Sequence, residues 1–259
     1  MAVTRDYMAT GWTRAASKIP FRIIPFRNRD KSFHESWTPG RDLLDFPHPF
    51  RMLLAAKPNG GKTTVILNLI LRSALGRRPF EKIMVIHCYP QETKEYDDVE
   101  HEQRAEIPDP QDFSSKVKTL CILEDLNYLS MSKEQKGRLE RLFGYASTHK
   151  NVSCILTAQD PFRILPTVRR CCNIFVLWNN QDTDMLRTLA RKTGQPVEQL
   201  QYMLHTHCQG AHDSLWIDLT PNSPAPFRIN GYERMDGQGR LLADPMAGQE
   251  EIVFFLGLE

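Results

Sequence analysis

The sequence predicts an α/β fold in which a mostly parallel sheet is flanked by helices. Three observations carry this prediction: short, almost uninterrupted apolar runs, longer stretches of helical periodicity between them, and an ordinary globular composition. Strands that are apolar at nearly every position are typical of a sheet covered on both faces, and helices supply the crossovers that parallel strands need. Of the 259 residues, 41 % are hydrophobic and 25 % charged, which excludes disordered, collagen-like and disulfide-scaffold classes.

The regular part of the chain begins at about residue 50, after a stretch punctuated by proline and glycine. The apolar runs predict strands over residues 50–56, 82–87, 119–123, 152–157 and 173–178, and a late pair over 214–219 and 227–230. Apolar residues spaced at three and four positions predict helices over 62–75, 133–147, 183–192 and 197–204.

This pattern divides the chain into three parts. Residues 1–49 form a basic, proline-rich arm, residues 50–230 the α/β domain, and residues 231–259 a C-terminal tail. The tail ends in the apolar run 252–256, which we expect to pack against its own core or another protein, because such a run is seldom left in water.

The formal net charge of the chain is only +2, but residues 1–31 carry seven basic and two acidic side chains. Such an arm can contact nucleic acid or an acidic partner, or be a solvated extension. Arg5 and Asp6 precede any apolar stretch, and no apolar run approaches the ~18 residues that cross a bilayer. We therefore expect no secretory signal, no membrane span and an intracellular location.

The cysteines and histidines favour structural roles. The six cysteines form no Cys-x-x-Cys pair and several lie in apolar runs, so we expect them to be reduced core residues. His205, His207, Cys208 and His212 are close in sequence, but their spacing matches no standard zinc site. A helix end is the favoured interpretation, with a metal site as the alternative.

The segment between the first strand and the first helix predicts a phosphate-binding loop. It reads Ala56-Lys-Pro-Asn-Gly-Gly-Lys-Thr63, against the pattern Gly, four residues, Gly-Lys-Thr. Ala56 replaces the first glycine, which an ordinary backbone conformation at that position would allow. The expected nucleotide-binding residues are Lys57, Pro58, Asn59, Gly60, Gly61, Lys62, Thr63 and Thr64.

The residue types in this loop match the chemistry of bound ATP and Mg²⁺. Gly60 and Gly61 let the loop curl so that backbone N–H groups face phosphate oxygens, and the N-terminus of the next helix adds its positive end. Lys62 is expected at the β- and γ-phosphates and the Thr63 hydroxyl at Mg²⁺.

Two carboxylates follow the strand over 119–123. Glu124 and Asp125 stand at the carboxyl edge of the sheet, where open α/β sheets bind ligands. We expect Glu124 at the metal position and Asp125 as the base that polarises the attacking water. The usual Asp-Glu order is inverted, so the base reaches about one methylene less far.

Polar groups after the next strand complete the candidate site. Gln159 follows the strand over 152–157 and can contact the γ-phosphate or orient the water. Arg169 and Arg170 precede the fifth strand. They can complete a neighbouring subunit's site, contact DNA, or be surface arginines at a helix end.

In this order the motifs resemble those of the poxvirus-type genome-packaging ATPases, of the FtsK/HerA group of P-loop motors. The specific part is the run Thr157-Ala-Gln-Asp-Pro161, followed by Leu165-Pro and an arginine, with a late strand over 215–221. The resemblance covers residues 50–230. The departures are Ala56 and the order of the two acids, which bear on rate more than on identity.

The resemblance implies an ATPase with a RecA-like sheet that carries an additional strand. It implies a homo-oligomeric ring at a capsid vertex that translocates double-stranded DNA, found in the host cytoplasm or nucleus where virions assemble, or in the virion. By position it makes Lys62 and Thr63 the nucleotide and Mg²⁺ contacts, Glu124 and Asp125 the acidic pair, and Gln159 the sensor. Arg169 or Arg170 would act in trans.

Two other functions remain open. A catalytically weak nucleotide-binding module, acting in DNA docking or structure, is favoured by the short Asp125 and the missing first glycine. A P-loop kinase ranks third, because the segment 90–110 is rich in Glu and Asp, whereas a lid that closes on phosphates needs arginines.

Overall fold

The computed structural model describes residues 48–71, 80–90, 94–97, 99–179, 183–221, 223 and 225–242. The expectations for the basic arm up to residue 47 and for the apolar run 252–256 lie outside the described residues. So do residues 72–75 of the first expected helix.

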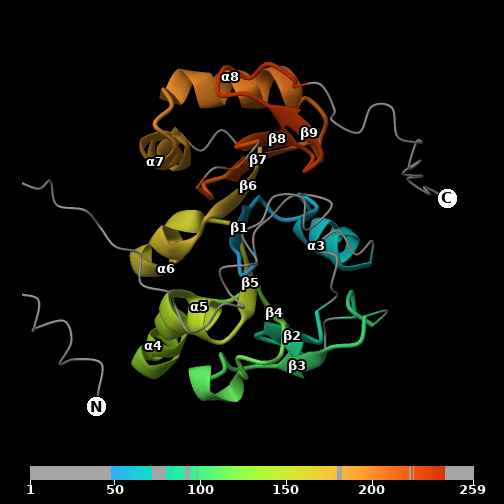
Figure 1. Cartoon of the computed structure of the whole chain (residues 1–259), viewed down its shortest axis with the longest axis vertical. Helices are drawn as coiled ribbons and strands as arrows, with labels where there is room; N and C mark the ends of the chain where they lie inside the picture. The colour runs from blue at the N-terminus through green and yellow to red at the C-terminus, as the bar shows by residue number, and fades with distance from the viewer. Residues whose placement is uncertain are drawn as a thin grey trace, which may run out of the picture. The chain divides into compact units, whose positions relative to one another are not determined.

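The described residues form a mixed sheet of nine strands (Figure 1). The strand order is β3-β2-β4-β5-β1-β6-β7-β8-β9. Neighbours from β3 to β6 pair in parallel, and β7, β8 and β9 continue the sheet in antiparallel fashion. The parallel strands are β1 (Arg51–Ala55), β2 (Lys82–His87), β3 (Glu102–Arg104), β4 (Thr119–Glu124), β5 (Val152–Ala158) and β6 (Ile174–Trp178). The antiparallel strands are β7 (Ser214–Asp218), β8 (Phe227–Ile229) and β9 (Glu233–Met235).

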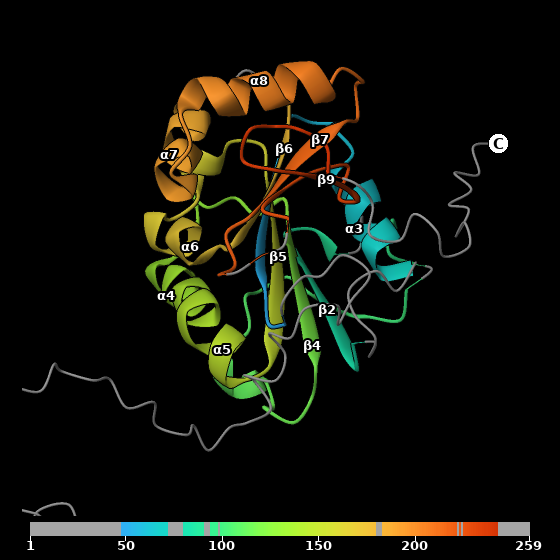
Figure 2. The same cartoon turned by 45° about the horizontal axis from the view of Figure 1, so that its top comes forward.

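Helices cover both faces of this sheet, as Figure 2 shows. The helix α3 (Lys62–Leu71) lies on one face. The other face carries α4 (Lys133–Arg141), α6 (Pro166–Cys171), α7 (Thr183–Thr193) and α8 (Val197–His207). After α4 the chain continues as the π-helical turn η5 (Leu142–Ala146) and as α5 (Ser147–His149). The short 3₁₀ turns are η4 (Pro110–Asp112) and η6 (Pro161–Arg163).

The core confirms the prediction of a sheet buried on both faces. Every residue of β4, β5 and β6 is buried. Along β1, Leu53 and Ala55 belong to the core under α4 to α8, whereas Met52 and Leu54 belong to the core under α3. This alternation follows from the two-residue period of a strand.

Two differences from the sequence prediction lie at the two ends of the sheet. The outermost strands β3 and β9 have only three residues each and give no apolar run in the sequence. In β3, Glu102 accepts hydrogen bonds from Lys82 and Arg104, charges that are typical of an edge strand. The strand β9 lies in the segment 231–259 that the sequence analysis expects to be a tail. The boundaries of that tail stay a prediction.

No helix among the described residues is long and apolar enough to cross a bilayer.

Candidate nucleotide-binding site

The loop between β1 and α3 has the backbone of a phosphate cradle. Positive φ angles fall on Asn59 (59°) and Gly61 (94°), not on Ala56. The Gly60 N–H donates to Lys57 O at 3.2 Å, and the Val65 N–H donates to Gly61 O at 3.0 Å as α3 begins. The loop therefore turns directly into the positive N-terminal end of a helix. Lys57, Pro58, Asn59 and Thr64 are exposed along it.

Close contact between two loop positions explains how alanine is accommodated at position 56. Ala56 is fully buried. A Cβ atom added to Gly60 would lie 2.8 Å from the Ala56 Cβ and 3.1 Å from Lys57 O, and carbon atoms do not approach so closely. The methyl group of Ala56 thus occupies space that is open only because residue 60 is glycine.

Lys62 lies folded across this loop. Its side chain is buried, and Nζ donates to Ala56 O at 3.1 Å and to Lys57 O at 3.3 Å. Burial lowers the pKa of Lys62, and the negative charges of Asp125 and Glu124 act in the opposite direction. An ammonium group with these neighbours is suited to bind an anion at the mouth of the loop.

Glu124 joins the end of β4 to the start of α3. The Thr63 hydroxyl donates to its Oε1, and the Tyr96 hydroxyl donates to its Oε2 at 2.6 Å. Burial raises the pKa of Glu124, while the hydrogen bonds from Thr63 and Tyr96 lower it. A carboxylate and a hydroxyl oxygen placed together in this way form a donor set that suits Mg²⁺.

Asp125 follows in a left-handed backbone conformation, with φ of 47°. Its N–H donates to the Thr157 hydroxyl on β5 at 3.2 Å, and its side chain is exposed at the carboxyl edge of the sheet. The sharp turn separates the two acids: Glu124 is buried beneath the loop, and Asp125 faces the solvent.

The remaining predicted site residues follow β5 and lie on α6. Gln159 is exposed directly after β5. On α6, the guanidinium carbon of Arg169 lies 4.8 Å from the centre of the Phe162 ring, and Arg170 is exposed. The backbone oxygen of Arg169 accepts a hydrogen bond from Lys192 Nζ at 3.0 Å. Of the two arginines, Arg170 is the one free to reach outward.

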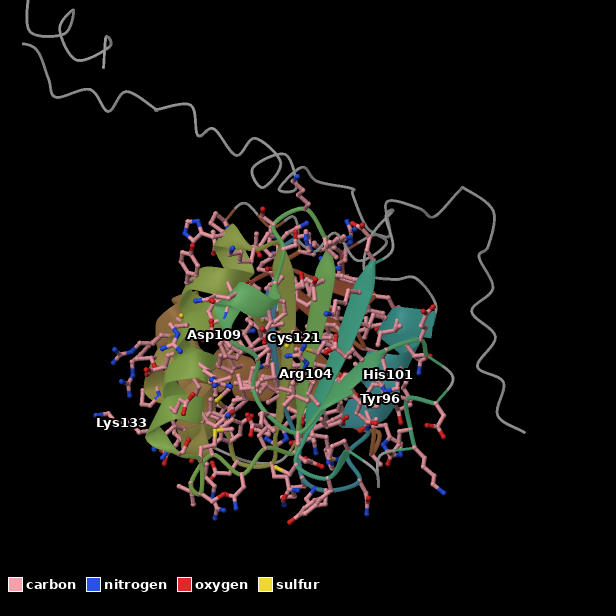
Figure 3. The ribbon with its side chains drawn as sticks, turned by 90° about the horizontal axis from the view of Figure 1, so that it is seen from below. Tyr96, His101, Arg104, Asp109, Cys121 and Lys133 are labelled. Carbon is pink, nitrogen blue, oxygen red and sulfur yellow. The ribbon has the colours of Figure 1, made fainter. Side chains whose placement is uncertain are left out.

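Tyr96 and His212 are two residues at the site that sequence reasoning did not assign to it. Tyr96 comes from the connection between β2 and β3 and neighbours His101, with ring centres 5.9 Å apart (Figure 3). His212 precedes β7, and its Nδ1 lies 3.5 Å from the position of a Cβ on Gly61. Neither belongs to a recognisable motif, so only their positions in the fold reveal them.

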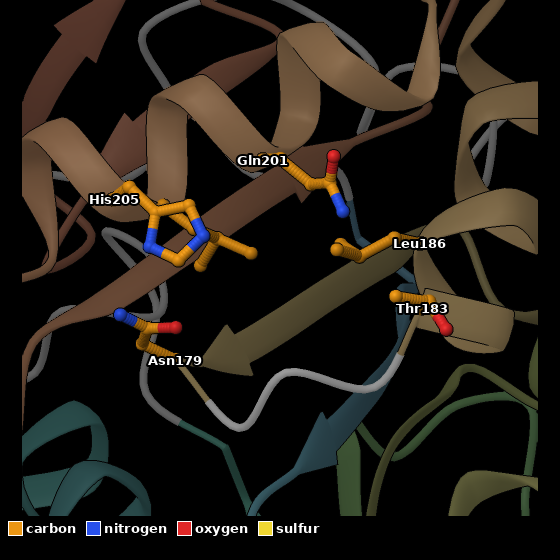
Figure 4. Close-up of a pocket in the computed structure, with 6 residues that line it drawn as sticks. Asn179, Thr183, Leu186, Gln201 and His205 are labelled. Atoms are coloured by element: carbon orange, nitrogen blue, oxygen red, sulfur yellow. The ribbon is translucent and has the colours of Figure 1, made fainter.

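The other members of the histidine and cysteine cluster point elsewhere. His207 Nε2 lies 3.0 Å from Gly239 O, and Cys208 is buried. His205 lines a pocket of about 310 Å³ between β6, α7 and α8, together with Asn179, Thr183, Leu186, Gln201 and Leu204 (Figure 4). The described part of the chain holds no group of three or more His, Cys, Asp or Glu side chains that could hold a metal ion.

Strand order and loop position together define the class of fold. The loop follows β1, the buried acid ends β4, and β5 lies between these two strands. This is the arrangement of a P-loop NTPase with an additional strand, as the resemblance implies.

Comparison with known proteins found similarity to solved structures and none at the level of sequence. The sequence matches no protein-family model and no curated protein. The DNA-packaging ATPase B204 of Sulfolobus turreted icosahedral virus is 13 % identical, with a TM-score of 0.49, over 70 % of this chain and 97 % of that one. The genome-packaging NTPase B204 of Sulfolobus turreted icosahedral virus 2, in complex with AMPPCP, is 14 % identical, with a TM-score of 0.46, over 70 % and 96 %. The pCW3 conjugation coupling protein TcpA, with ATPγS, is 11 % identical, with a TM-score of 0.47, over 67 % and 58 %.

Proposed function

We propose that this chain is a Mg²⁺-dependent ATPase of the poxvirus-type, FtsK/HerA-like packaging motors, which moves double-stranded DNA into a preformed capsid. The observation that carries the ATPase is the hydrogen bond from the Thr63 hydroxyl to Glu124. It unites the phosphate loop with the acid at the end of β4. The DNA, the ring and the capsid vertex rest on the motif order that the chain shares with those motors.

The residues of the loop fit ATP and Mg²⁺. Thr63 and Glu124 supply the oxygen atoms that would hold the ion, and Lys62 the charge that would meet the β- and γ-phosphates. Bound Mg²⁺ would neutralise negative charge on the phosphates during transfer to water. Asp125 accepts a proton from the attacking water, Gln159 orients that water, and Arg170 or Arg169 contacts the nucleotide of a neighbouring subunit. We propose assembly sites of virions as the location.

Steady-state ATP hydrolysis with Mg²⁺, with and without double-stranded DNA, tests this function. We expect DNA-stimulated turnover that falls at least a hundredfold in Lys62→Ala and in Asp125→Ala, since each removes a charge used in the transition state. The control is Lys116→Ala, which removes an exposed lysine from the loop before β4. This variant should leave turnover unchanged.

Two results would count against the motor. Turnover that DNA does not stimulate would remove the translocation part and leave an ATPase. Nucleotide binding without turnover would favour the binding module, for which the specific observation is the short, solvent-facing Asp125 in its left-handed turn.

A further inference from the structure

Tyr96 belongs to a segment without a recognisable motif, and its side chain contacts the candidate metal site. The side chain is fully buried in the same core cluster as Ile66 of α3 and Val85 of β2. Its hydroxyl donates to Glu124 Oε2 at 2.6 Å. The residue lies 28 positions before its partner, in the short stretch 94–97 between β2 and β3.

The two hydroxyl groups that donate to Glu124, those of Thr63 and Tyr96, differ in how far they are buried. Thr63 is half-buried at the loop, and its hydroxyl would turn toward Mg²⁺ when the nucleotide binds. The Tyr96 hydroxyl is held inside the core, where it donates to Glu124. If Thr63 turned toward a bound ion, Tyr96 would be the donor that still orients Glu124.

The inverted order of the acids makes this restraint important. A glutamate at the metal position has one more rotatable bond than the aspartate usual there, so its carboxylate has more orientations to lose on binding. A hydrogen bond from a rigid ring fixes one of them, as groups behind a metal ligand commonly do.

We infer that Tyr96 is a positioning residue for Mg²⁺ binding, which acts only through the carboxylate of Glu124. This inference rests on the proposed function. Because Tyr96 is buried and its hydroxyl donates to Glu124, removal of that hydroxyl should weaken the contribution of Mg²⁺ to nucleotide affinity and leave metal-free nucleotide binding intact.

The test is titration of the full chain with a fluorescent ATP analogue, once in Mg²⁺ and once in EDTA. In Tyr96→Phe we expect the gain in affinity that Mg²⁺ brings to fall about tenfold, as for other groups behind metal ligands, with affinity in EDTA unchanged. The matched control is Tyr128→Phe, because Tyr128 is also buried and its hydroxyl donates to a backbone oxygen, Thr157 O, at 3.4 Å. This control should keep the full gain.

The other outcomes would overturn either the inference alone or the inference together with the proposed function. No nucleotide binding by the unaltered chain would overturn the proposed function and this inference together. Binding with an unchanged Mg²⁺ gain in Tyr96→Phe, or an equal loss with and without Mg²⁺, would overturn the inference alone.

A double variant tests whether Tyr96 acts through the carboxylate of Glu124. Tyr96→Phe added to Glu124→Ala should cost no further Mg²⁺ gain, because the carboxylate is already absent. A further loss in that double variant would show that Tyr96 acts by another route and would overturn the inference.

Discussion

Ala56 and Gly60 show how a departure from a motif is accommodated at the scale of single residues. The first glycine of the usual pattern is replaced by a buried alanine whose φ is not positive. Its methyl group lies where a side chain on residue 60 would be. The substitution is therefore tolerated because of a second residue in the loop, and the two positions should be coupled.

This coupling gives a testable prediction. Gly60→Ala should weaken binding of a fluorescent ATP analogue at least tenfold and lower the free energy of unfolding by about 1–3 kcal/mol, since overpacking displaces the loop. Ala56→Gly/Gly60→Ala should recover part of both losses; the contact with Lys57 O, at 3.1 Å, remains.

Ala56→Gly alone serves as the control and should bind the analogue as the unaltered chain does. A double variant no better than Gly60→Ala would show that the two methyl groups do not compete for space.

At the scale of elements, the antiparallel strands β7, β8 and β9 depend on a glycine turn. Gly231 lies between β8 and β9 with φ of 85°, and a Cβ there would lie 3.3 Å from the Trp216 ring on β7. Left-handed conformation and close approach of a ring both favour glycine. By contrast, Gly144 lies in the helical turn η5, and a Cβ there would meet no atom within 4 Å.

These two glycines predict opposite effects of the same substitution. Gly231→Ala should lower the free energy of unfolding by about 1–3 kcal/mol through strain and crowding. Gly144→Ala should raise it by about 0.5–1 kcal/mol, because alanine loses less backbone entropy in a helix. Urea unfolding of both variants measures the difference, and a shift of equal sign in the two would refute it.

At the scale of the whole molecule, His48 joins the segment before β1 to the amino end of the central strand β5. Its Nε2 lies 2.5 Å from Asn151 Oδ1, and the Ser153 hydroxyl lies 2.8 Å from its Nδ1. These contacts fit a neutral ring that donates at one nitrogen and accepts at the other. Burial lowers the pKa of His48 to about 4; the Asn151 hydrogen bond raises it, and Lys118 lowers it further.

The depressed pKa predicts a loss of stability in acid. Between pH 6.5 and 4 the unfolded chain binds a proton at His48 that the folded chain does not, so stability falls as the pH falls through this window. A difference of about 2.5 pKa units corresponds to about 3 kcal/mol. Urea unfolding between pH 8 and pH 4 measures it, and the difference from His48→Gln isolates this residue. Identical pH profiles for the two chains would contradict the prediction.

Most of the sheet was predictable because its signals are local. The buried strands β1, β2, β4, β5 and β6 are apolar at nearly every position, and the loop motif falls where a strand turns into a helix. The strands β3 and β9 were missed because three polar or mixed residues pair only when a neighbouring strand is already in place. The π-helical turn η5 also lay inside a stretch that reads simply as helix.

For the site, the sequence by itself determined which residues stand at the carboxyl ends of strands: the loop up to Thr63, the acids Glu124 and Asp125, and Gln159. Periodicity and turn chemistry act over a few residues, so a single sequence is enough to place these residues at the ends of strands. Only the tertiary structure decided which side chains meet. The hydroxyl of Tyr96 on Glu124 and the imidazole of His212 beside Gly61 depend on the order of strands in the sheet, which brings together segments far apart in the chain.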